Sequence, residues 1–209
     1  MKKIIALVAG LAMSMTAVFA EHTLGLGLNI PVNSLTIDSE DVFEIGFGVD
    51  LSYLFIHDSG ITAKADAGFK SLSADSDIPY LEGNGVSFGF DLGAGYTFIN
   101  EEKFSLSALA MFGVTIGGVN ADFTDSFETE EIKAETTLTI ETFDIGADVI
   151  GKYKFTDHLG AFVNLGLRYA INMKTECEIE YEGGDTFKVD DIKTSGIRFL
   201  PTLGVSWTF

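Results

Sequence analysis

The feature that most constrains this chain is a strict period-two alternation of apolar residues with small or polar ones. From 43 to 55 every odd-numbered residue is apolar, while the even positions carry Glu, Gly, Asp, Ser and Leu. Successive side chains of a strand point to opposite faces, so this pattern is typical of a β-strand and not of a helix. It recurs along the chain and predicts eight strands, at roughly 22–32, 42–56, 61–71, 85–98, 104–117, 138–155, 159–172 and 195–209.

The predicted connections alternate in length. Three of them, at 57–60, 99–103 and 156–158, are short enough for tight turns. The other four are longer and cover 33–41, 72–84, 118–137 and 173–194. An even number of antiparallel strands, with short turns at one end and long loops at the other, is the layout of an up-and-down outer-membrane barrel.

Alternation alone permits a soluble, lipocalin-like binding barrel, apolar inside, or a membrane barrel, apolar outside. The face of each strand opposite the apolar row is rich in Gly, Ser, Thr and Asp. It is poor in the Lys and Glu that coat soluble sheets. The apolar rows are long enough for a tilted membrane-crossing strand. Aromatic residues at the row ends are predicted to form interfacial girdles: Tyr53, Tyr96, Tyr153, Tyr169, Trp207 and Phe209. These observations favour an all-β transmembrane barrel, with the soluble barrel as the alternative.

The last strand carries a resemblance. The chain ends Val205-Ser206-Trp207-Thr208-Phe209, which resembles the C-terminal signature of outer-membrane β-barrel proteins. As a whole, the chain is similar to the small eight-stranded barrels of the OmpA transmembrane domain, OmpX, OmpW and opacity-protein kind. The resemblance implies an outer-membrane location, lipid around the barrel, and recognition of Phe209 by the barrel-assembly machinery. We expect a monomer.

The first twenty residues are predicted to be a signal peptide. Lys2 and Lys3 precede an apolar run over 4–11, and small residues at Val18 and Ala20 suit cleavage after Ala20. The alternative is a membrane anchor. We therefore expect a signal peptide at 1–20 and one barrel domain at 21–209, exported from the cytoplasm.

Composition excludes several classes of function. The chain has 31 acidic and 13 basic residues, a net charge of −18, so it lacks the basic footprint that nucleic acid requires. A mean hydropathy of +0.27 is unusually high for so acidic a chain. The single cysteine, Cys177, rules out a disulfide framework and a Cys-rich zinc module. We expect an exposed thiol in the last loop.

The polar face should line the lumen. Charges enclosed in a narrow barrel must pair, so they are predicted to form a polar plug. Turn positions place Arg168 opposite Gly146, and Asp50 opposite Asp66; Lys70 and Lys154 fall nearer the rims. A gated path for protons or small solutes is the alternative. The predicted lumen network is Glu44, Asp50, Lys64, Asp66, Asp91, Asp144, Asp148, Lys152, Arg168 and Arg198.

Signals for catalysis are weak. His22, His57 and His158 fall at the turn end, and none has a Ser partner in a recognisable triad spacing. We expect no enzyme, metal or cofactor. Pro201 falls within the last strand; since Pro cannot donate to a ladder, a bulge or a lost hydrogen bond is expected there.

The long connections carry most of the acidic residues. We expect a surface-exposed structural or interaction role, in which acidic loops contact host molecules or other surface ligands. Alternation persists over 135–141 and 175–182, which predicts that these strands continue beyond the membrane as a protruding sheet. The alternative function is a narrow, OmpW-like channel for small or apolar solutes.

Overall fold

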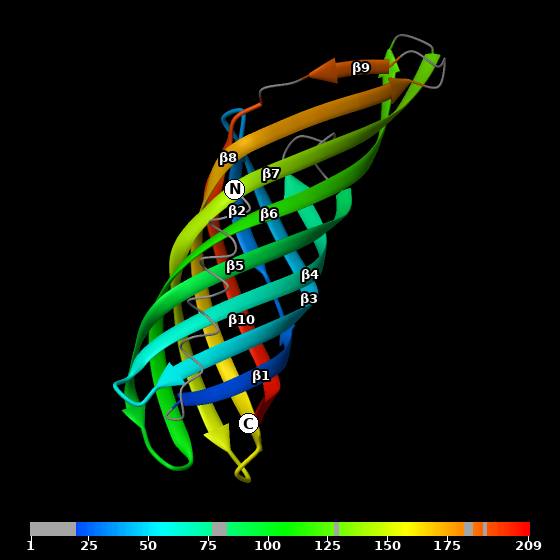
Figure 1. Cartoon of the computed structure of the whole chain (residues 1–209). Coiled ribbons are helices and arrows are strands. Elements are labelled where there is room, and N and C mark those ends of the chain that lie inside the picture. Colours follow the sequence, from blue (N-terminus) through cyan, green and yellow to red (C-terminus); the bar gives the residue numbers. More distant parts are fainter. Residues whose placement is uncertain (1–19, 77–82, 128–129, 182–185, 190–191) are drawn as a thin grey trace, which may run out of the picture.

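The computed structural model describes residues 20–76, 83–127, 130–181, 186–189 and 192–209, with backbone only at Ser76 and over 121–134. The described residues form an almost entirely β structure in which every pairing is antiparallel (Figure 1). The strands are β1 (Ala20–Asn29), β2 (Val32–Ile37), β3 (Glu40–His57), β4 (Ile61–Ser76), β5 (Gly83–Asn100), β6 (Phe104–Phe127), β7 (Glu130–Lys154), β8 (Leu159–Tyr181), β9 (Thr186–Val189) and β10 (Thr194–Thr208).

The barrel wall is eight strands wide. β1 and β2 count as one of these strands, because both pair with β3 on one side and with β10 on the other, in one continuous register. The other strands of the wall follow chain order from β3 to β8, and β10 pairs with β8 to close the ring. β9 lies outside the ring and pairs with β8. The predicted eight-stranded up-and-down barrel is confirmed.

Pro201 interrupts one ladder without bulging its strand. β10 keeps an unshifted register with β8 from Ser195 to Trp207, through Pro201 opposite Leu165. On the other side the strand pairing breaks between β1 and β2, at Ile30 and Pro31. The Ile30 amide still donates to the Pro201 carbonyl at 3.1 Å. The expected local loss of pairing therefore occurs, whereas a bulge at Pro201 does not.

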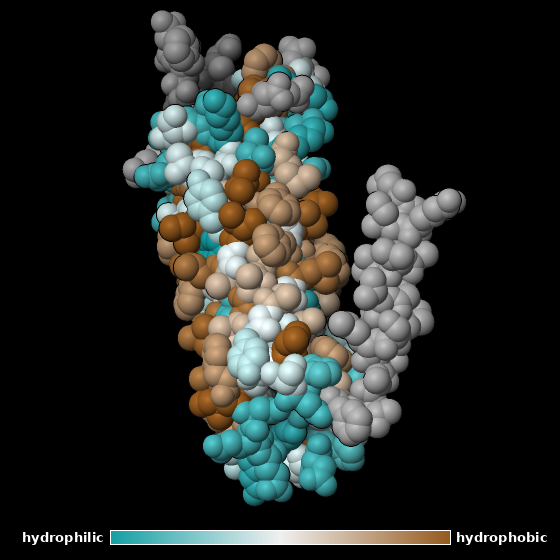
Figure 2. Space-filling model, turned by 60° about the vertical axis from the view of Figure 1, so that its left-hand side comes forward, coloured by the Kyte–Doolittle hydropathy of each residue, from teal (hydrophilic) through white to brown (hydrophobic). Residues whose placement is uncertain are grey.

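The barrel is inverted relative to a soluble one. Leu26 and Phe69 on the outer face are 54% and 56% exposed, whereas Asp148 and Lys152 in the lumen are 0% and 2% exposed. On the face that Figure 2 shows, an apolar band lies between two hydrophilic ends. The predicted girdle residues all lie exposed on the outer surface: Tyr53, Tyr96, Tyr153, Tyr169, Trp207 and Phe209. The described residues contain no helix long and apolar enough to span a membrane.

Two of the segments predicted as long loops are mostly strand. The segment 33–41 is not a long loop, because β2 and β3 join through a two-residue turn at Asp38 and Ser39, whose φ angles are 48° and 79°. Positive φ at both positions is the mark of the primed hairpin turn that matches strand twist. The segment 118–137 is also mostly strand, since β6 and β7 pair as far as Phe127 and Glu130. The predicted protruding sheet is confirmed, and it includes β6, β7, β8 and β9 (Figure 1).

A β-bulge at Met173 sets the outer part of β8. Thr142 pairs with Asn172 but Glu141 pairs with Lys174, so Met173 is an extra residue on β8. Beyond it the inward positions change from even to odd numbers, and Thr175 and Cys177 become buried. If Met173 occupied a regular position in the ladder instead of the bulge, the glutamates at 176, 178 and 180 would point into the barrel.

Deleting Met173 is therefore expected to remove the bulge and leave a regular ladder with Thr175 and Cys177 still inward, so the yield of folded barrel should stay close to that of the parent. The measurement is the heat-modifiable fraction on gels after refolding in detergent, together with β content by circular dichroism. Met173→Leu keeps the residue count and should fold like the parent. A severe loss of folded barrel in the deletion variant would contradict this register and show that folding needs the bulge itself.

Candidate functional site in the barrel lumen

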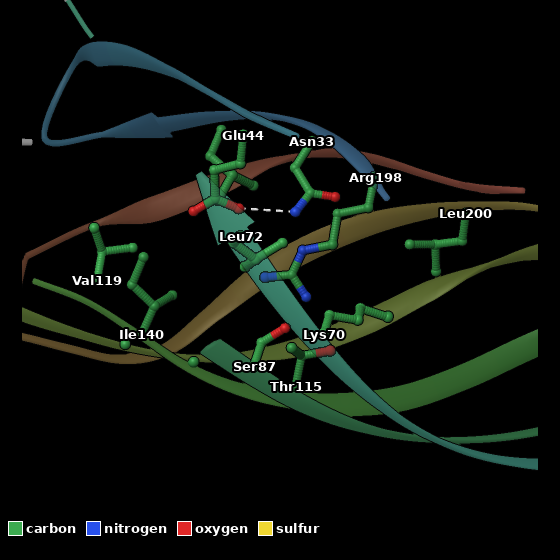
Figure 3. Close-up of a pocket in the computed structure, with 13 residues that line it drawn as sticks. Asn33, Glu44, Lys70, Leu72, Ser87, Thr115, Val119, Ile140, Arg198 and Leu200 are labelled. Carbon is green, nitrogen blue, oxygen red and sulfur yellow. Dashed lines mark hydrogen bonds between the residues drawn. The ribbon is translucent and has the colours of Figure 1, made fainter. Parts of the chain in front are cut away.

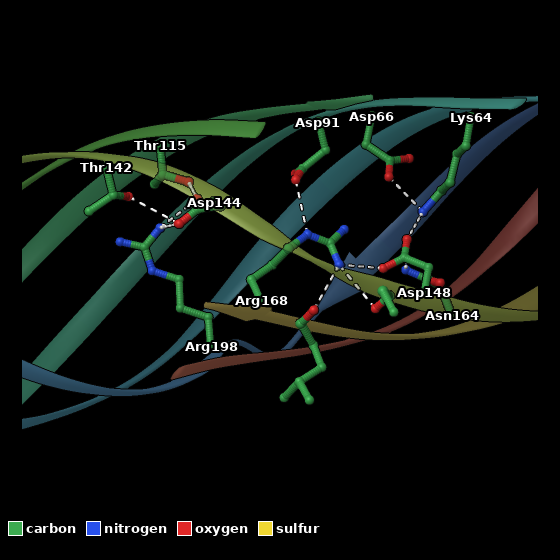
Figure 4. Close-up of polar contacts among 12 residues, drawn as sticks. Lys64, Asp66, Asp91, Thr115, Thr142, Asp144, Asp148, Asn164, Arg168 and Arg198 are labelled. Carbon is green, nitrogen blue, oxygen red and sulfur yellow. Dashed lines mark hydrogen bonds and ion pairs between the residues drawn. The ribbon is translucent and has the colours of Figure 1, made fainter. Parts of the chain in front are cut away.

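The lumen is organised around Asp148, which no solvent reaches. One carboxylate oxygen of Asp148 accepts from Lys64 Nζ at 2.6 Å, and the other from Arg168 at 2.6 Å. Lys64 also pairs with Asp66 at 2.5 Å, and Arg168 Nε with Asp91 at 3.0 Å (Figure 4). Asn164 donates to Asp148 at 3.2 Å. Charges from β4, β5, β7 and β8 are thus linked through one buried carboxylate.

A second group lies nearer the protruding end. Arg198 pairs with Asp144 at 3.0 Å, and Asp144 also accepts from Thr115 at 2.6 Å and from Thr142 at 3.2 Å (Figure 4). Glu44 accepts from Asn33 at 2.8 Å. Charge-assisted bonds of this kind are what make buried charges tolerable.

All ten side chains of the predicted network point into the lumen, and seven of them are buried. Arg168 lies opposite Gly146, at the expected register. The expected Asp50–Asp66 pair is wrong. Asp50 lies opposite Gly68, and Asp66 lies opposite Ser52 and Asp91. The β3–β4 connection has three residues ending in Gly60 at φ +88°, which moves the centre of the hairpin by one residue.

Sequence reasoning misplaced one charged member of the lumen and missed another. Lys70 is buried in mid-barrel, not near a rim. Glu21, the first residue of the predicted mature chain, pairs with both Lys152 and Lys154 at the turn end. Lys64 and Lys70 are an even number of residues apart on β4, so they share the inward face. This spacing was the signal that could have placed Lys70 in the lumen.

Apolar clusters close both ends of the charged layer. At the protruding end the buried cluster consists of Leu35, Ile37, Val42, Ala74, Val119, Leu138, Ile140, Ala170 and Cys177. At the turn end it consists of Leu54, Ile56, Leu109, Met111 and Ile150. We call these the outer and inner stoppers. Phe162 also fills the lumen at the turn end, against the glycines at 25 and 204, where an added Cβ would approach its ring to within 3 Å.

Three small cavities remain in the described part of the lumen. The first lies between Lys70, Arg198 and Glu44, below the outer stopper (Figure 3). The second lies beside Asp50, Asp66 and Asp91, and the third is near Lys152 and Phe162. Each has a volume of about 20 Å³, room for about one water molecule.

The histidines do not converge. His22 Nδ1 lies 2.6 Å from the Tyr53 hydroxyl on the outer surface, and His57 Nδ1 lies 2.9 Å from Ser59 Oγ. His158 stacks on Trp207 at a ring distance of 5.3 Å. Among the described residues, no group of three or more His, Cys, Asp or Glu side chains is placed to hold a metal ion.

Comparison with known families decides the assignment. The family model described as the outer membrane protein beta-barrel domain matches residues 4–209. The chain belongs to this family. Its location is therefore the outer membrane, with lipid around the apolar band of the barrel.

Solved structures place this outer-membrane barrel among similar folds. A major outer membrane protein from Thermus thermophilus aligns with a TM-score of 0.56 at 14% identity, covering 88% of this chain and 99% of that one. The outer membrane protease OmpT from Escherichia coli aligns at 0.47 and 11% identity, covering 93% and 98%. Ail of Yersinia pestis, in complex with the heparin analogue sucrose octasulfate, aligns at 0.45 and 12% identity, covering 92% and 100%. At such identities the likeness shows the fold alone. No curated protein sequence matches.

The prediction of an exposed thiol is wrong. Cys177 is 7% exposed and belongs to the outer stopper, because the bulge at Met173 turns it inward. Burial raises the pKa of the Cys177 thiol. The thiolate that reacts with alkylating agents is therefore scarcer at a given pH than in an exposed cysteine.

We expect maleimide to label Cys177 roughly 100-fold more slowly in the folded barrel than in denaturant, the factor given by an opening free energy of about 3 kcal/mol. Because the thiol pKa is raised, the rate should increase at a higher pH than for an exposed cysteine. Labelling reactions stopped at set times and analysed by mass spectrometry give the rate and its pH dependence. A Cys177→Ser, Ser59→Cys variant is the exposed control, and equal rates for the two proteins would contradict the burial.

Proposed function

We propose that this outer-membrane barrel is a closed, non-catalytic scaffold that acts through its protruding sheet. The observation that carries the proposal is the filled lumen: two apolar stoppers enclose a network of buried ion pairs. An eight-stranded barrel is just wide enough for side chains to fill it. The working surface is then the part that extends beyond the membrane.

The protruding sheet supports an interaction role. β9 pairs with β8, and all four of its residues are exposed, including Phe187 at 58%. An exposed strand edge is a template for pairing with an extended segment of another chain. Beside it, Glu178 on β8 forms an exposed ion pair with Lys188 on β9 at 2.8 Å. We propose host or other surface ligands as the partners of this edge.

The remaining assignments follow from the same arrangement. Phe209 is 59% exposed at the turn end, where its amide donates to the His22 carbonyl at 3.0 Å, and we propose that the barrel-assembly machinery reads it there. β1 begins at Ala20, so the proposed cleavage after Ala20 would leave Glu21 as the first residue of the wall. We also propose that the barrel is monomeric and not an enzyme.

A narrow channel is the second candidate, and the chain of small cavities along the lumen favours it. Conduction would require the stoppers and the ion pairs to separate together. Planar-bilayer recording of the refolded protein distinguishes the two functions.

We expect no discrete conductance steps from wild-type protein, because the network leaves no continuous path. Heat-modifiable migration of the same sample is the control for folding, and a known porin is the control for insertion. Steady unitary steps from the folded protein would contradict the closed scaffold and favour the channel.

The surface role has its own test. A Lys188→Cys variant on intact cells should react quickly with a membrane-impermeant maleimide, whereas wild type, with only the buried Cys177, should react slowly. Failure of the variant to react, with folding confirmed by gel migration, would contradict an exposed β9.

A further inference from the structure

The second lumen cavity carries a surplus of negative charge. Its charged lining consists of Asp50, Asp66 and Asp91 against Lys70 and Arg168. Two more residues are bonded into the same cluster: Lys64 pairs with Asp66, and Asp148 pairs with both Lys64 and Arg168 (Figure 4). Counting them gives four carboxylates and three cations. One negative charge is therefore left without an opposite charge inside a closed barrel.

The same cavity has unused acceptor oxygens. Asn29 is 1% exposed and Asn164 is 6% exposed, both line the cavity, and the Oδ1 atom of each has no hydrogen-bond partner. They lie on either side of Thr202, which is the cross-strand partner of both. Leaving such buried acceptors unpaired is costly.

The donors of Asn29, Asn164 and Thr202 are already committed. Asn29 Nδ2 donates to Thr202 at 2.9 Å, Thr202 donates to Asp50 at 3.1 Å, and Asn164 Nδ2 donates to Asp148 at 3.2 Å. Reversing the Asn164 amide would place its oxygen against the Asp148 carboxylate. The wall around Thr202 therefore presents oxygen atoms alone to the cavity.

We propose that this cavity binds one monovalent metal cation, of the size of Na⁺ or K⁺, through Asp50, the amide oxygens of Asn29 and Asn164, and water. A single positive charge balances the surplus carboxylate and satisfies both amide oxygens at once. A divalent ion is disfavoured, because among the described side chains no three acidic groups converge closely enough to hold it. Water alone would satisfy the amides but would leave the buried charge uncompensated. The site stabilises the barrel and does not depend on the proposed surface role.

Thermal unfolding of the refolded full-length protein in detergent tests the site. We compare NaCl, KCl and choline chloride at equal ionic strength, followed by heat-modifiable migration. The midpoint should be several degrees higher in at least one alkali-metal salt than in choline chloride, and should rise with the logarithm of that ion's concentration above its Kd. Asp50→Asn removes the surplus charge, so its midpoint should be the same in all three salts. Glu44→Gln, in the first cavity, should keep the wild-type salt dependence.

Crystals of the wild-type protein soaked in RbCl decide the case even if Asp50→Asn fails to fold. An anomalous peak between Asn29, Asn164 and Asp50 supports the proposal. Equal wild-type midpoints in the three salts, or density for water only at that position, would overturn it and show that a proton compensates the surplus charge.

Discussion

The structure depends on how charge is held inside a barrel whose outside is lipid. Asp148 has no contact with solvent, yet it bonds to Lys64, Arg168 and Asn164 from three directions. Removing one member of such a group leaves the others buried and unpaired, which costs about 3–5 kcal/mol. Because the members come from β4, β5, β7 and β8, the network links these strands across the lumen as well as around it.

The closed ends and the protruding sheet follow from the same constraint. The outer and inner stoppers pack apolar side chains against the two ends of the central charged layer, and a low-dielectric interior strengthens ion pairs. The bulge at Met173 lies where the lumen changes from polar to apolar, and it turns Cys177 inward and the glutamates outward. One extra residue therefore completes the outer stopper and supplies the acidic face of the sheet.

The period-two alternation was enough to predict the closed barrel, the inverted faces and the inward direction of the charged residues. Where a turn centre could be located correctly, as at Asp157, the opposition of Arg168 and Gly146 also followed. The Asp50–Asp66 pair failed because Gly60 adopts a left-handed conformation that adds a residue to the turn. The burial of Cys177 could not be foreseen, since a one-residue bulge leaves no clear mark in hydropathy and reverses every position after it. The stoppers were missed because their apolar residues lie on the inward face and resemble breaks in the polar row.

A double-mutant cycle on Asp148 and Arg168 tests the central claim most directly. Free energies of unfolding in urea, measured in detergent, are compared for Asp148→Asn, Arg168→Met and the double variant. A linked buried network predicts strong coupling, near the upper end of the range of about 0.5–3 kcal/mol that contacting residues give, with the double variant much less destabilised than the sum of the single ones. Additive effects would contradict the account, because they would show that the two charges contribute independently and that no shared network holds the lumen closed.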